Sequence, residues 1–150
     1  MPQSLHALAV HIVFSTKCRR PFLHSKIRPG LWAFMAGILR NLECYAVHIG
    51  GVEDHVHIAC NLTKKHAPMK VLEGVKKNSS KWLKTQSAEF RGFHWQDGYG
   101  LFSVSPSHVE ALRKYIADQD EHHRRETFQD ELMRILKKYA VEYDERYLWD

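Results

Sequence analysis

Two histidines at alternate positions, His55 and His57, stand in an otherwise apolar segment, residues 55–62. Successive side chains of a β-strand point to opposite faces, so both imidazoles lie on one face while Val56 and Ile58 lie on the other. Their Cβ atoms are then about 7 Å apart, close enough for both rings to bind one metal ion. The segment therefore predicts a strand with one apolar face for the core and two nitrogen ligands on the other.

A glutamine interrupts the apolar face of a predicted helix at residues 106–122. Leu112 and Ile116 lie on that face, and Gln119 falls within about 20° of Leu112 on a helical wheel. Leaving a buried amide unpaired costs about 1 to 3 kcal/mol, so we expect Gln119 to meet a hydrogen-bonding group, water or a metal. Tyr115, one turn earlier, lies on the flank of the same face.

These residue types together suggest phosphate chemistry. Two imidazoles and an amide oxygen form a three-ligand metal site with open positions, which is what a catalytic metal needs to hold a substrate phosphate. Ionising a tyrosine at pH 7 costs about 4 kcal/mol, and a nearby cation favours the phenolate, so Tyr115 is a candidate nucleophile. Mixed nitrogen and oxygen ligands suit Mn²⁺ at least as well as Mg²⁺. His122 lies almost above Tyr115 on the wheel. It could accept the tyrosine proton or contact the phosphate, although its polar neighbours favour a plain solvated turn.

Several elements must position these side chains. Apolar and β-branched runs predict four strands, at residues 5–14, 45–52, 55–62 and 100–104. Apolar residues at helical spacing predict four helices, at residues 31–42, 68–86, 106–122 and from 128 onward, with Thr127 as the cap of the last one. An acidic and aromatic tail begins at about residue 140, and the sequence leaves open whether it docks on a partner subunit or on the chain's own surface.

The helix predicted at residues 68–86 carries an ordered set of lysines. At 100° per residue, Lys70, Lys77, Lys81 and Lys84 fall within a sector of about 60°. Such a stripe is either a solvated surface or a set of contacts to DNA phosphates. Four contacts to single-stranded DNA would make the logarithm of the binding constant fall with the logarithm of the salt concentration at a slope near −2.8, about 0.7 per contact. This slope is called the salt slope.

Length and composition limit the class of protein. The 150 residues suit one domain, and the net charge of +5 makes a polyanion a plausible partner. No apolar run is long enough to span a membrane and no signal peptide is visible, so we expect a cytoplasmic protein without a membrane partner. The three cysteines lack C-x-x-C spacing, which argues against a disulfide framework or a structural zinc site.

Three blocks of this sequence resemble the single-tyrosine HUH transposases of small bacterial insertion sequences (IS200-like) and their relatives associated with repetitive extragenic palindromes. The blocks are His55-Val56-His57, residues 95–99 leading to 102–105, and residues 115–119. A His-x-His pair alone is a weak signal. Followed about sixty residues later by a helix with Tyr-x-x-x-Gln, it is a strong one, and the resemblance covers the chain from its first strand to about residue 122.

The resemblance implies that His55, His57 and Gln119 bind a divalent metal, Mg²⁺ or Mn²⁺, and that Tyr115 is the nucleophile of a DNA transposase. The family cleaves single-stranded DNA, forms a 5′-phosphotyrosine link and a free 3′-hydroxyl, and reverses the reaction to rejoin strands. The resemblance also implies hairpin-bearing DNA as the partner and a homodimer in which the tyrosine helix can serve the partner's histidines. The implied fold is α+β, with a central antiparallel sheet flanked by helices, as in ferredoxin-like proteins.

Two other functions stay open. A nucleotide hydrolase of the histidine-triad type needs a third histidine at the next alternate position, where this chain has Ala59. A transposase-derived protein that binds hairpin DNA without mobilising it fits the same motifs, although the chain keeps every proposed catalytic residue. The other histidines share no ligand spacing and are expected to be ordinary surface or core residues: His6, His11, His24, His48, His66, His94 and His108.

Overall fold

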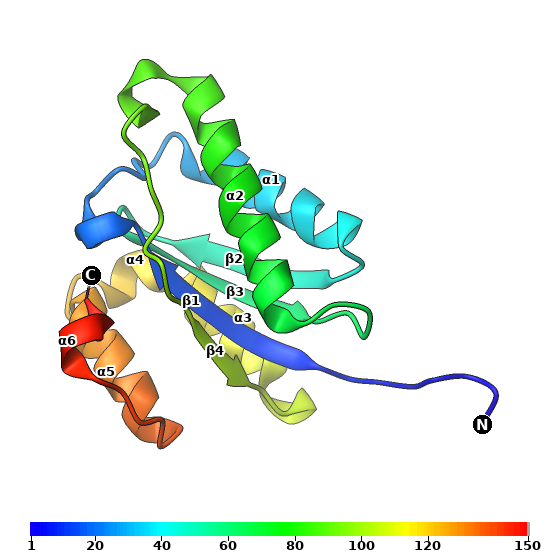
Figure 1. The fold of residues 1–150 in the computed structure, drawn as a ribbon. Helices are drawn as coiled ribbons and strands as arrows, with labels where there is room; N and C mark the ends of the chain where they lie inside the picture. Colours follow the sequence, from blue (N-terminus) through cyan, green and yellow to red (C-terminus); the bar gives the residue numbers. More distant parts are fainter. Residues whose placement is uncertain (150) are drawn as a thin grey trace.

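A four-stranded sheet forms the centre of the computed structural model, which describes residues 1–149 (Figure 1). The strands are β1 (Ala9–Ser15), β2 (Tyr45–Gly51), β3 (His55–Asn61) and β4 (Gly100–Ser103). Their order in the sheet is β2-β3-β1-β4, and every neighbouring pair is antiparallel. The α+β fold with a central antiparallel sheet is therefore confirmed, although β1 begins at Ala9 and not at residue 5.

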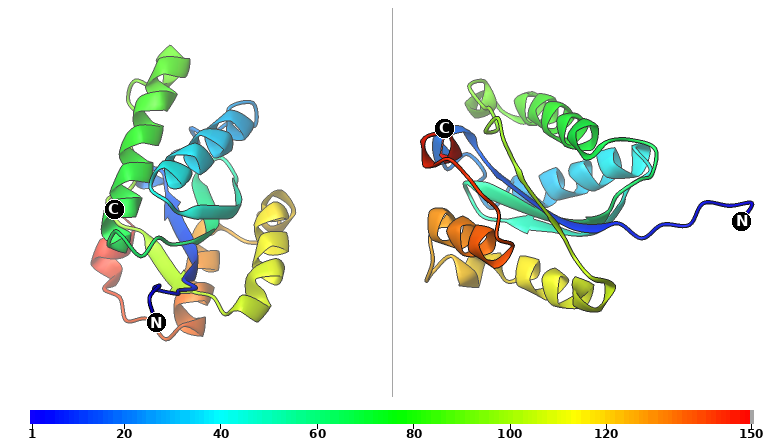
Figure 2. Two further views of the ribbon diagram at one scale, coloured as in Figure 1. Left: turned by 90° about the vertical axis from the view of Figure 1, so that its right-hand side faces the viewer. Right: turned by 60° about the horizontal axis from the view of Figure 1, so that its bottom comes forward.

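Helices cover both faces of the sheet, so the fold has three layers (Figure 2). One face carries α1 (Arg28–Asn41) and α2 (Pro68–Gln86), and the other carries α3 (Val109–Ala117), α4 (Gln119–His122) and α5 (Phe128–Lys138). The remaining elements are short: η1 (Lys17–Arg19), η2 (Ala88–Phe90), η3 (Pro106–His108) and α6 (Glu145–Leu148). Within residues 1–149, no helix combines the length and apolar composition required to span a membrane.

The main hydrophobic core lies between the sheet and the layer of α1 and α2. Val56, Ile58 and Cys60 of β3 belong to this core and are at most 1 % exposed. His55 and His57 belong to the opposite face, where the layer of α3 to α5 buries them completely. The alternation predicted for this strand is confirmed, and both imidazoles are removed from water.

A second, smaller hydrophobic cluster holds α5 against the histidine-bearing face of the sheet. It joins residues of β1, β4 and α5: Val13, Phe102, Phe128, Leu132, Ile135 and Leu136. As predicted, Thr127 caps α5, because its Oγ1 accepts a hydrogen bond of 3.2 Å from the backbone N–H of Asp130. Apolar packing and this cap together fix the position of α5.

The single helix predicted at residues 106–122 is broken in two. Residues 106–108 form a 3₁₀ turn, α3 ends at Ala117, and α4 begins at Gln119. Between them Asp118 has φ −95° and ψ 19°, outside the range of a regular helix, and aspartate is a weak helix former. The break lies between Tyr115 and Gln119 and is slight, because the Asp118 N–H still donates to Lys114 O at 3.1 Å and Asp118 O accepts from the His122 N–H at 3.0 Å.

The C-terminal tail folds back on the chain's own surface. Trp149 packs against the second hydrophobic cluster, and its carbonyl accepts a hydrogen bond of 3.0 Å from Arg19 Nη1. Tyr143 and Tyr147 stay exposed. Of the two docking surfaces left open by the sequence, Trp149 uses the one on its own chain.

Candidate active site

The two histidines of β3 are held in the orientation of metal ligands. His55 Nδ1 lies 2.6 Å from Asp54 Oδ1, and His57 Nδ1 lies 2.7 Å from His11 Nε2. Both Nε2 atoms are thereby left to face the interior of the α3 to α5 layer. A metal-binding imidazole usually has its second nitrogen fixed in this way by a carboxylate or another polar group.

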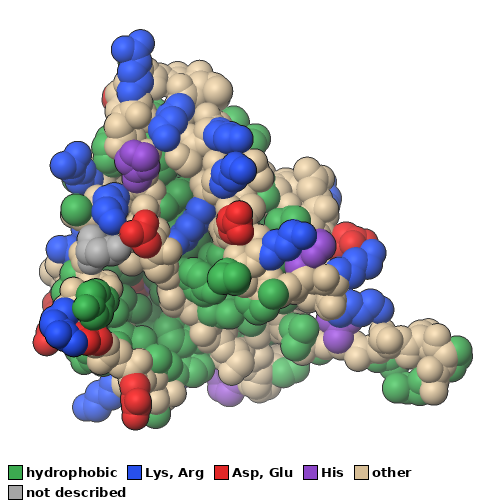
Figure 3. Space-filling view, in the orientation of Figure 1, with side chains coloured by type: hydrophobic (Ala, Val, Ile, Leu, Met, Phe, Trp, Pro, Cys, Tyr) green, Lys and Arg blue, Asp and Glu red, His purple; other side chains and the backbone are tan. Residues whose placement is uncertain are grey.

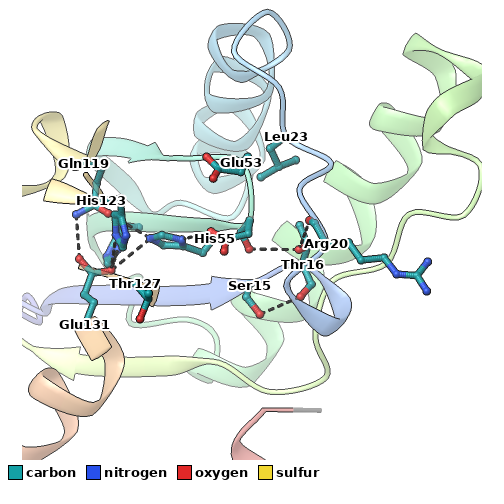
Figure 4. A network of polar contacts seen from close by, with 12 residues as sticks. Ser15, Thr16, Arg20, Leu23, Glu53, His55, Gln119, His123, Thr127 and Glu131 are labelled. Atoms are coloured by element: carbon teal, nitrogen blue, oxygen red, sulfur yellow. Dashed lines mark hydrogen bonds and ion pairs between the residues drawn. The ribbon is translucent and has the colours of Figure 1, made fainter. Parts of the chain in front are cut away.

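Glu131 of α5 occupies the point on which the imidazoles converge. Its Oε1 lies 2.9 Å from His57 Nε2, 3.3 Å from His55 Nε2 and 3.1 Å from the Nε2 of His123, which directly follows α4. The carboxylate is completely buried. Figure 4 shows His55, His123 and Glu131 pointing toward one another from three different segments of the chain.

Gln119 is buried and partnered, as its place on the apolar face predicts. It is 1 % exposed. Its Oε1 lies 3.2 Å from His55 Nε2, and its Nε2 donates a hydrogen bond of 3.2 Å to Glu131 Oε2. The structure therefore brings the amide oxygen to one of the two β3 histidines, where the sequence expects a third ligand.

Tyr115 lies beside this cluster within the same chain. Its ring centroid is 5.9 Å from that of His57. Its hydroxyl donates a hydrogen bond to Glu131 Oε2 and accepts one of 3.0 Å from Arg134 Nη2. The candidate nucleophile, both β3 histidines and Gln119 thus meet without a second subunit.

His122 contacts the tyrosine ring and not its hydroxyl. The two ring centroids are 4.7 Å apart, at an interplanar angle of 76°. His122 Nε2 lies 3.2 Å from Arg134 Nη2 and 3.2 Å from Glu126 Oε2. The residue predicted to accept the proton is therefore a neighbour of Tyr115, but the groups bonded to the hydroxyl are Glu131 and Arg134.

Burial and hydrogen bonding shift the pKa values of the cluster in opposite directions. Burial lowers the pKa of His55, but Asp54 and Glu131 outweigh it and raise that pKa to about 9. For His57 burial prevails and lowers the pKa to about 4. Burial also raises the pKa of Glu131, yet its hydrogen bonds to the histidines hold it well below the ordinary value. The metal-free site therefore contains an imidazolium and a carboxylate, which compensate each other's charge.

Burial, followed by the negative charge of Glu131, raises the pKa of Tyr115 above its ordinary value of 10. Arg134 opposes this shift, because its guanidinium donates to the phenol oxygen. In the metal-free chain the hydroxyl stays protonated at neutral pH. A cation placed among the imidazoles would favour the phenolate.

The donor set fits a divalent metal. The ligand atoms of His55, His57, His123 and Glu131 all lie within 4.8 Å of one another, and the amide oxygen of Gln119 is adjacent. Imidazole nitrogens combined with carboxylate and amide oxygens match Mn²⁺ and related transition ions better than an all-oxygen magnesium site. The chemistry of the donors, together with the fixed Nδ1 atoms, supports a metal centre at this position.

A cavity of about 430 Å³ opens beside Tyr115, between α3 and α5. Its floor includes His11 and Ser103, and α5 contributes Arg134 and Lys138 to its wall. Two cationic side chains and Tyr115 therefore border one concave space. A phosphate entering it would meet the candidate nucleophile.

The lysine stripe lies in a different layer from this cavity. Lys70, Lys77, Lys81 and Lys84 are all exposed on α2, which covers the opposite face of the sheet. Figure 3 shows basic side chains gathered over α2. The structure brings together the predicted ligands and the tyrosine, but not the lysines with them.

Several residues of the site were not identified from the sequence. Glu131 stands three residues after Phe128, on the apolar face of α5, so the argument that identified Gln119 applies to it as well. His123 belongs to a polar run that is typical of a solvated turn. His11 is expected to be an ordinary surface or core residue, and the antiparallel register that places it beside His57 is visible only in the fold.

The fold and site define a class of protein: an α+β domain in which a tyrosine adjoins a buried cluster of histidines suited to a metal. The sequence profile described as "Transposase IS200 like" matches residues 4–119, and the chain belongs to this family. The resemblance seen in the sequence is confirmed. No curated protein matches the chain.

Two solved structures share this fold. One, named as a transposase from Deinococcus radiodurans R1, is 21 % identical and has a TM-score of 0.61, with 77 % of this chain and 93 % of that chain covered. The other is a REP-associated tyrosine transposase bound to a REP hairpin. It is 12 % identical and has a TM-score of 0.61, with 81 % of this chain and 71 % of that chain covered.

Proposed function

We propose that this chain is a metal-dependent single-stranded DNA endonuclease and strand transferase that acts through a phosphotyrosine at Tyr115. One observation carries the proposal: the Tyr115 hydroxyl lies in the same buried cluster as His55, His57 and Gln119. Membership of the transposase family supports the reaction class. The separate blocks of sequence that suggested this chemistry are neighbours in space.

In the proposed reaction, Tyr115 Oη attacks the phosphorus of a scissile phosphate. The bond from phosphorus to the 3′-oxygen breaks, the tyrosine proton passes to an acceptor in the site, and the 3′-oxygen leaves as a hydroxyl after taking up a proton. Attack of a 3′-hydroxyl on the phosphotyrosine reverses these steps and joins strands. The covalent link conserves the phosphodiester bond energy, so no nucleotide cofactor is required.

The residues of the site divide this work. His55, His57 and Gln119 would hold a divalent metal, Mn²⁺ or Mg²⁺, which supplies Lewis-acid stabilisation of charge on the phosphate. Arg134 donates to the phenol oxygen and lowers the cost of its ionisation. His122 stays the predicted proton acceptor. We expect His122→Ala to slow cleavage and to alter its pH profile, and an unchanged rate and pH profile would exclude this role.

DNA with hairpins is the proposed partner. A solved relative with this fold is bound to a REP hairpin, which supports the same class of ligand here. The cavity beside Tyr115 would take the scissile strand, while the lysines of α2, in the other layer, would contact a more distant part of the DNA. A homodimer stays a prediction, and the described site does not need one to be complete.

The test uses hairpin-bearing single-stranded oligonucleotides mixed with the full chain and Mn²⁺. We expect a protein–DNA adduct that survives denaturation and is absent from Tyr115→Phe and from His57→Ala. An adduct that persists in Tyr115→Phe contradicts the assignment of the nucleophile. Hairpin binding without any adduct favours the alternative, a transposase-derived protein that binds hairpins without mobilising them.

A further inference from the structure

Two side chains of the cluster come from the segment after residue 119, where the match to the family ends. They are Glu131 of α5 and His123, directly after α4. Glu131 is completely buried, and burying a carboxylate is costly unless charged and hydrogen-bonding partners compensate. Its surroundings therefore indicate what this carboxylate does.

The two oxygens of Glu131 face different groups. Oε1 lies 2.9 to 3.3 Å from the Nε2 atoms of three imidazoles. Oε2 accepts hydrogen bonds from the Tyr115 hydroxyl and from the Gln119 amide. One carboxylate thus joins the histidine cluster to the candidate nucleophile.

We propose that Glu131 and His123 bind the same metal as the three ligands predicted from the sequence, and that Glu131 also positions the Tyr115 hydroxyl beside it. This inference rests on the proposed function, because it concerns the same metal. It assigns a role to α5, which the motifs of the sequence leave without one. Metal binding and placement of the nucleophile then depend on a single side chain.

The donor count is consistent with this role. Three imidazole nitrogens and two oxygens give five donors, and an octahedral ion has one further position for a phosphate oxygen. The share of nitrogen favours Mn²⁺ over Mg²⁺, which prefers oxygen ligands and retains its water. A site of this composition should therefore discriminate between the two ions more strongly than a site with only two imidazoles.

A purely structural role, in which Glu131 only anchors α5 to the sheet, does not account for the position of its carboxylate among the imidazoles. The helix is already held by its apolar cluster and by the Thr127 cap. His55 is also held by two ring contacts, since Phe128 stacks on it at 4.6 Å and His123 forms a T-shaped contact at 4.4 Å. What Glu131 adds is an oxygen directed at three ring nitrogens, which is an arrangement of ligands.

The test measures Mn²⁺ binding without DNA. The full chain is stripped with a chelator and titrated with Mn²⁺, and the electron paramagnetic resonance signal of the free ion gives the dissociation constant. Glu131→Gln should weaken binding by at least about 100-fold, the upper end of the cost of losing an outer ligand partner. Asp130→Asn, an exposed acid on the same helix, is the matched control and should bind like the parent. A folded Glu131→Gln variant with parental affinity overturns the proposal.

A second measurement needs no variant. Electron spin-echo spectra of Mn²⁺ bound to the parental chain count the coordinated imidazoles, and we expect three. Two imidazoles would overturn the assignment of His123, while the titration of Glu131→Gln tests that of Glu131. Failure of the proposed function is distinct from either result, because Tyr115→Phe should keep its Mn²⁺ affinity whether or not the parent forms a DNA adduct.

Discussion

The hydroxyl of Tyr115 donates a hydrogen bond to the carboxylate of Glu131, although the two residues lie 16 positions apart on different helices. The same carboxylate contacts both β3 histidines. The candidate nucleophile and the candidate metal ligands are therefore parts of one hydrogen-bonded unit. Changes to the buried histidines and their partners should therefore alter stability and metal binding, which allows predictions beyond the reaction itself.

The stability of the metal-free chain should depend on pH through His55. Its pKa of about 9 in the folded chain exceeds the ordinary value of 6.5, so folding holds a proton that the unfolded chain releases. This contribution is fully present below pH 6.5 and is lost as the pH rises through 9, at a cost on the order of 3 kcal/mol. Urea unfolding in the presence of a chelator, between pH 6.5 and 10, measures this decline.

Below pH 6.5, His57 and His11 should make the stability of the metal-free chain rise with pH, opposite to the effect of His55 at alkaline pH. Burial, the main cause for both, lowers their pKa values to about 4 and about 3, so unfolding takes up protons below pH 6.5 and stability falls as the pH decreases. The metal-free chain should thus be most stable near pH 6.5. Asp54→Asn removes a hydrogen bond that raises the pKa of His55 and should flatten the alkaline decline. A parental chain with constant stability from pH 6.5 to 9 would contradict the assignment.

Replacing His11 should weaken metal binding, although this residue is not a predicted ligand. His11 Nε2 bonds His57 Nδ1 at 2.7 Å and so fixes the ring whose Nε2 faces the centre. Loss of such an outer partner typically costs about 10- to 100-fold in metal affinity. We expect His11→Phe, which keeps a flat buried ring, to show this loss in an Mn²⁺ titration. Phe102→Leu, a change in a neighbouring ring without polar atoms, should not.

Local patterns account for much of this molecule. Alternation predicted the buried face and the histidine face of β3, helical spacing predicted α2 with its observed bounds, and the misplaced amide of Gln119 predicted a polar centre. Each of these inferences needs only residues within one element. The sequence can therefore indicate which side chains require a partner.

Contacts between side chains of different helices and strands depend on how distant parts of the sequence pack together. His57 meets Glu131 from 74 positions away and His11 from 46 positions away, and neither separation follows from a periodicity. His123 likewise meets Glu131 on a different helix, while its polar neighbours in the sequence suggest a solvated turn. The ligand set could thus be predicted in part from the sequence, but the carboxylate at its centre required the fold.

A methyl group at Gly50 should displace the helix that carries the tyrosine. A Cβ there would lie 2.9 Å from the backbone oxygen of Ile116 and 2.9 Å from its Cγ2, both too close for an ordinary contact. Gly50→Ala should cost about 1–3 kcal/mol in stability. Because Ile116 adjoins Tyr115, we also expect adduct formation to slow by about 100-fold, as for a reacting group misplaced by about 1 Å.

Gly37 in α1 offers a matched control, because a Cβ there would meet nothing within 4 Å. Gly37→Ala should stabilise the chain by about 0.4–1 kcal/mol and leave the rate of adduct formation unchanged. Thermal unfolding and single-turnover adduct assays on both variants make the comparison. Parental rates in Gly50→Ala would show that α3 accommodates the methyl group without moving the tyrosine.

The lysine stripe of α2 should strengthen DNA binding through its positive charge. Lys77, Lys81 and Lys84 are exposed and lie in the layer opposite the proposed active site, so they cannot act on the scissile phosphate directly. If they contact phosphates, their joint replacement by alanine lowers the magnitude of the salt slope by about 2, at about 0.7 per contact. Replacement of all three by arginine keeps the charges and should keep the slope. The measurement is hairpin binding at several salt concentrations between about 50 and 300 mM. An alanine variant with the parental slope would exclude the stripe from the DNA interface.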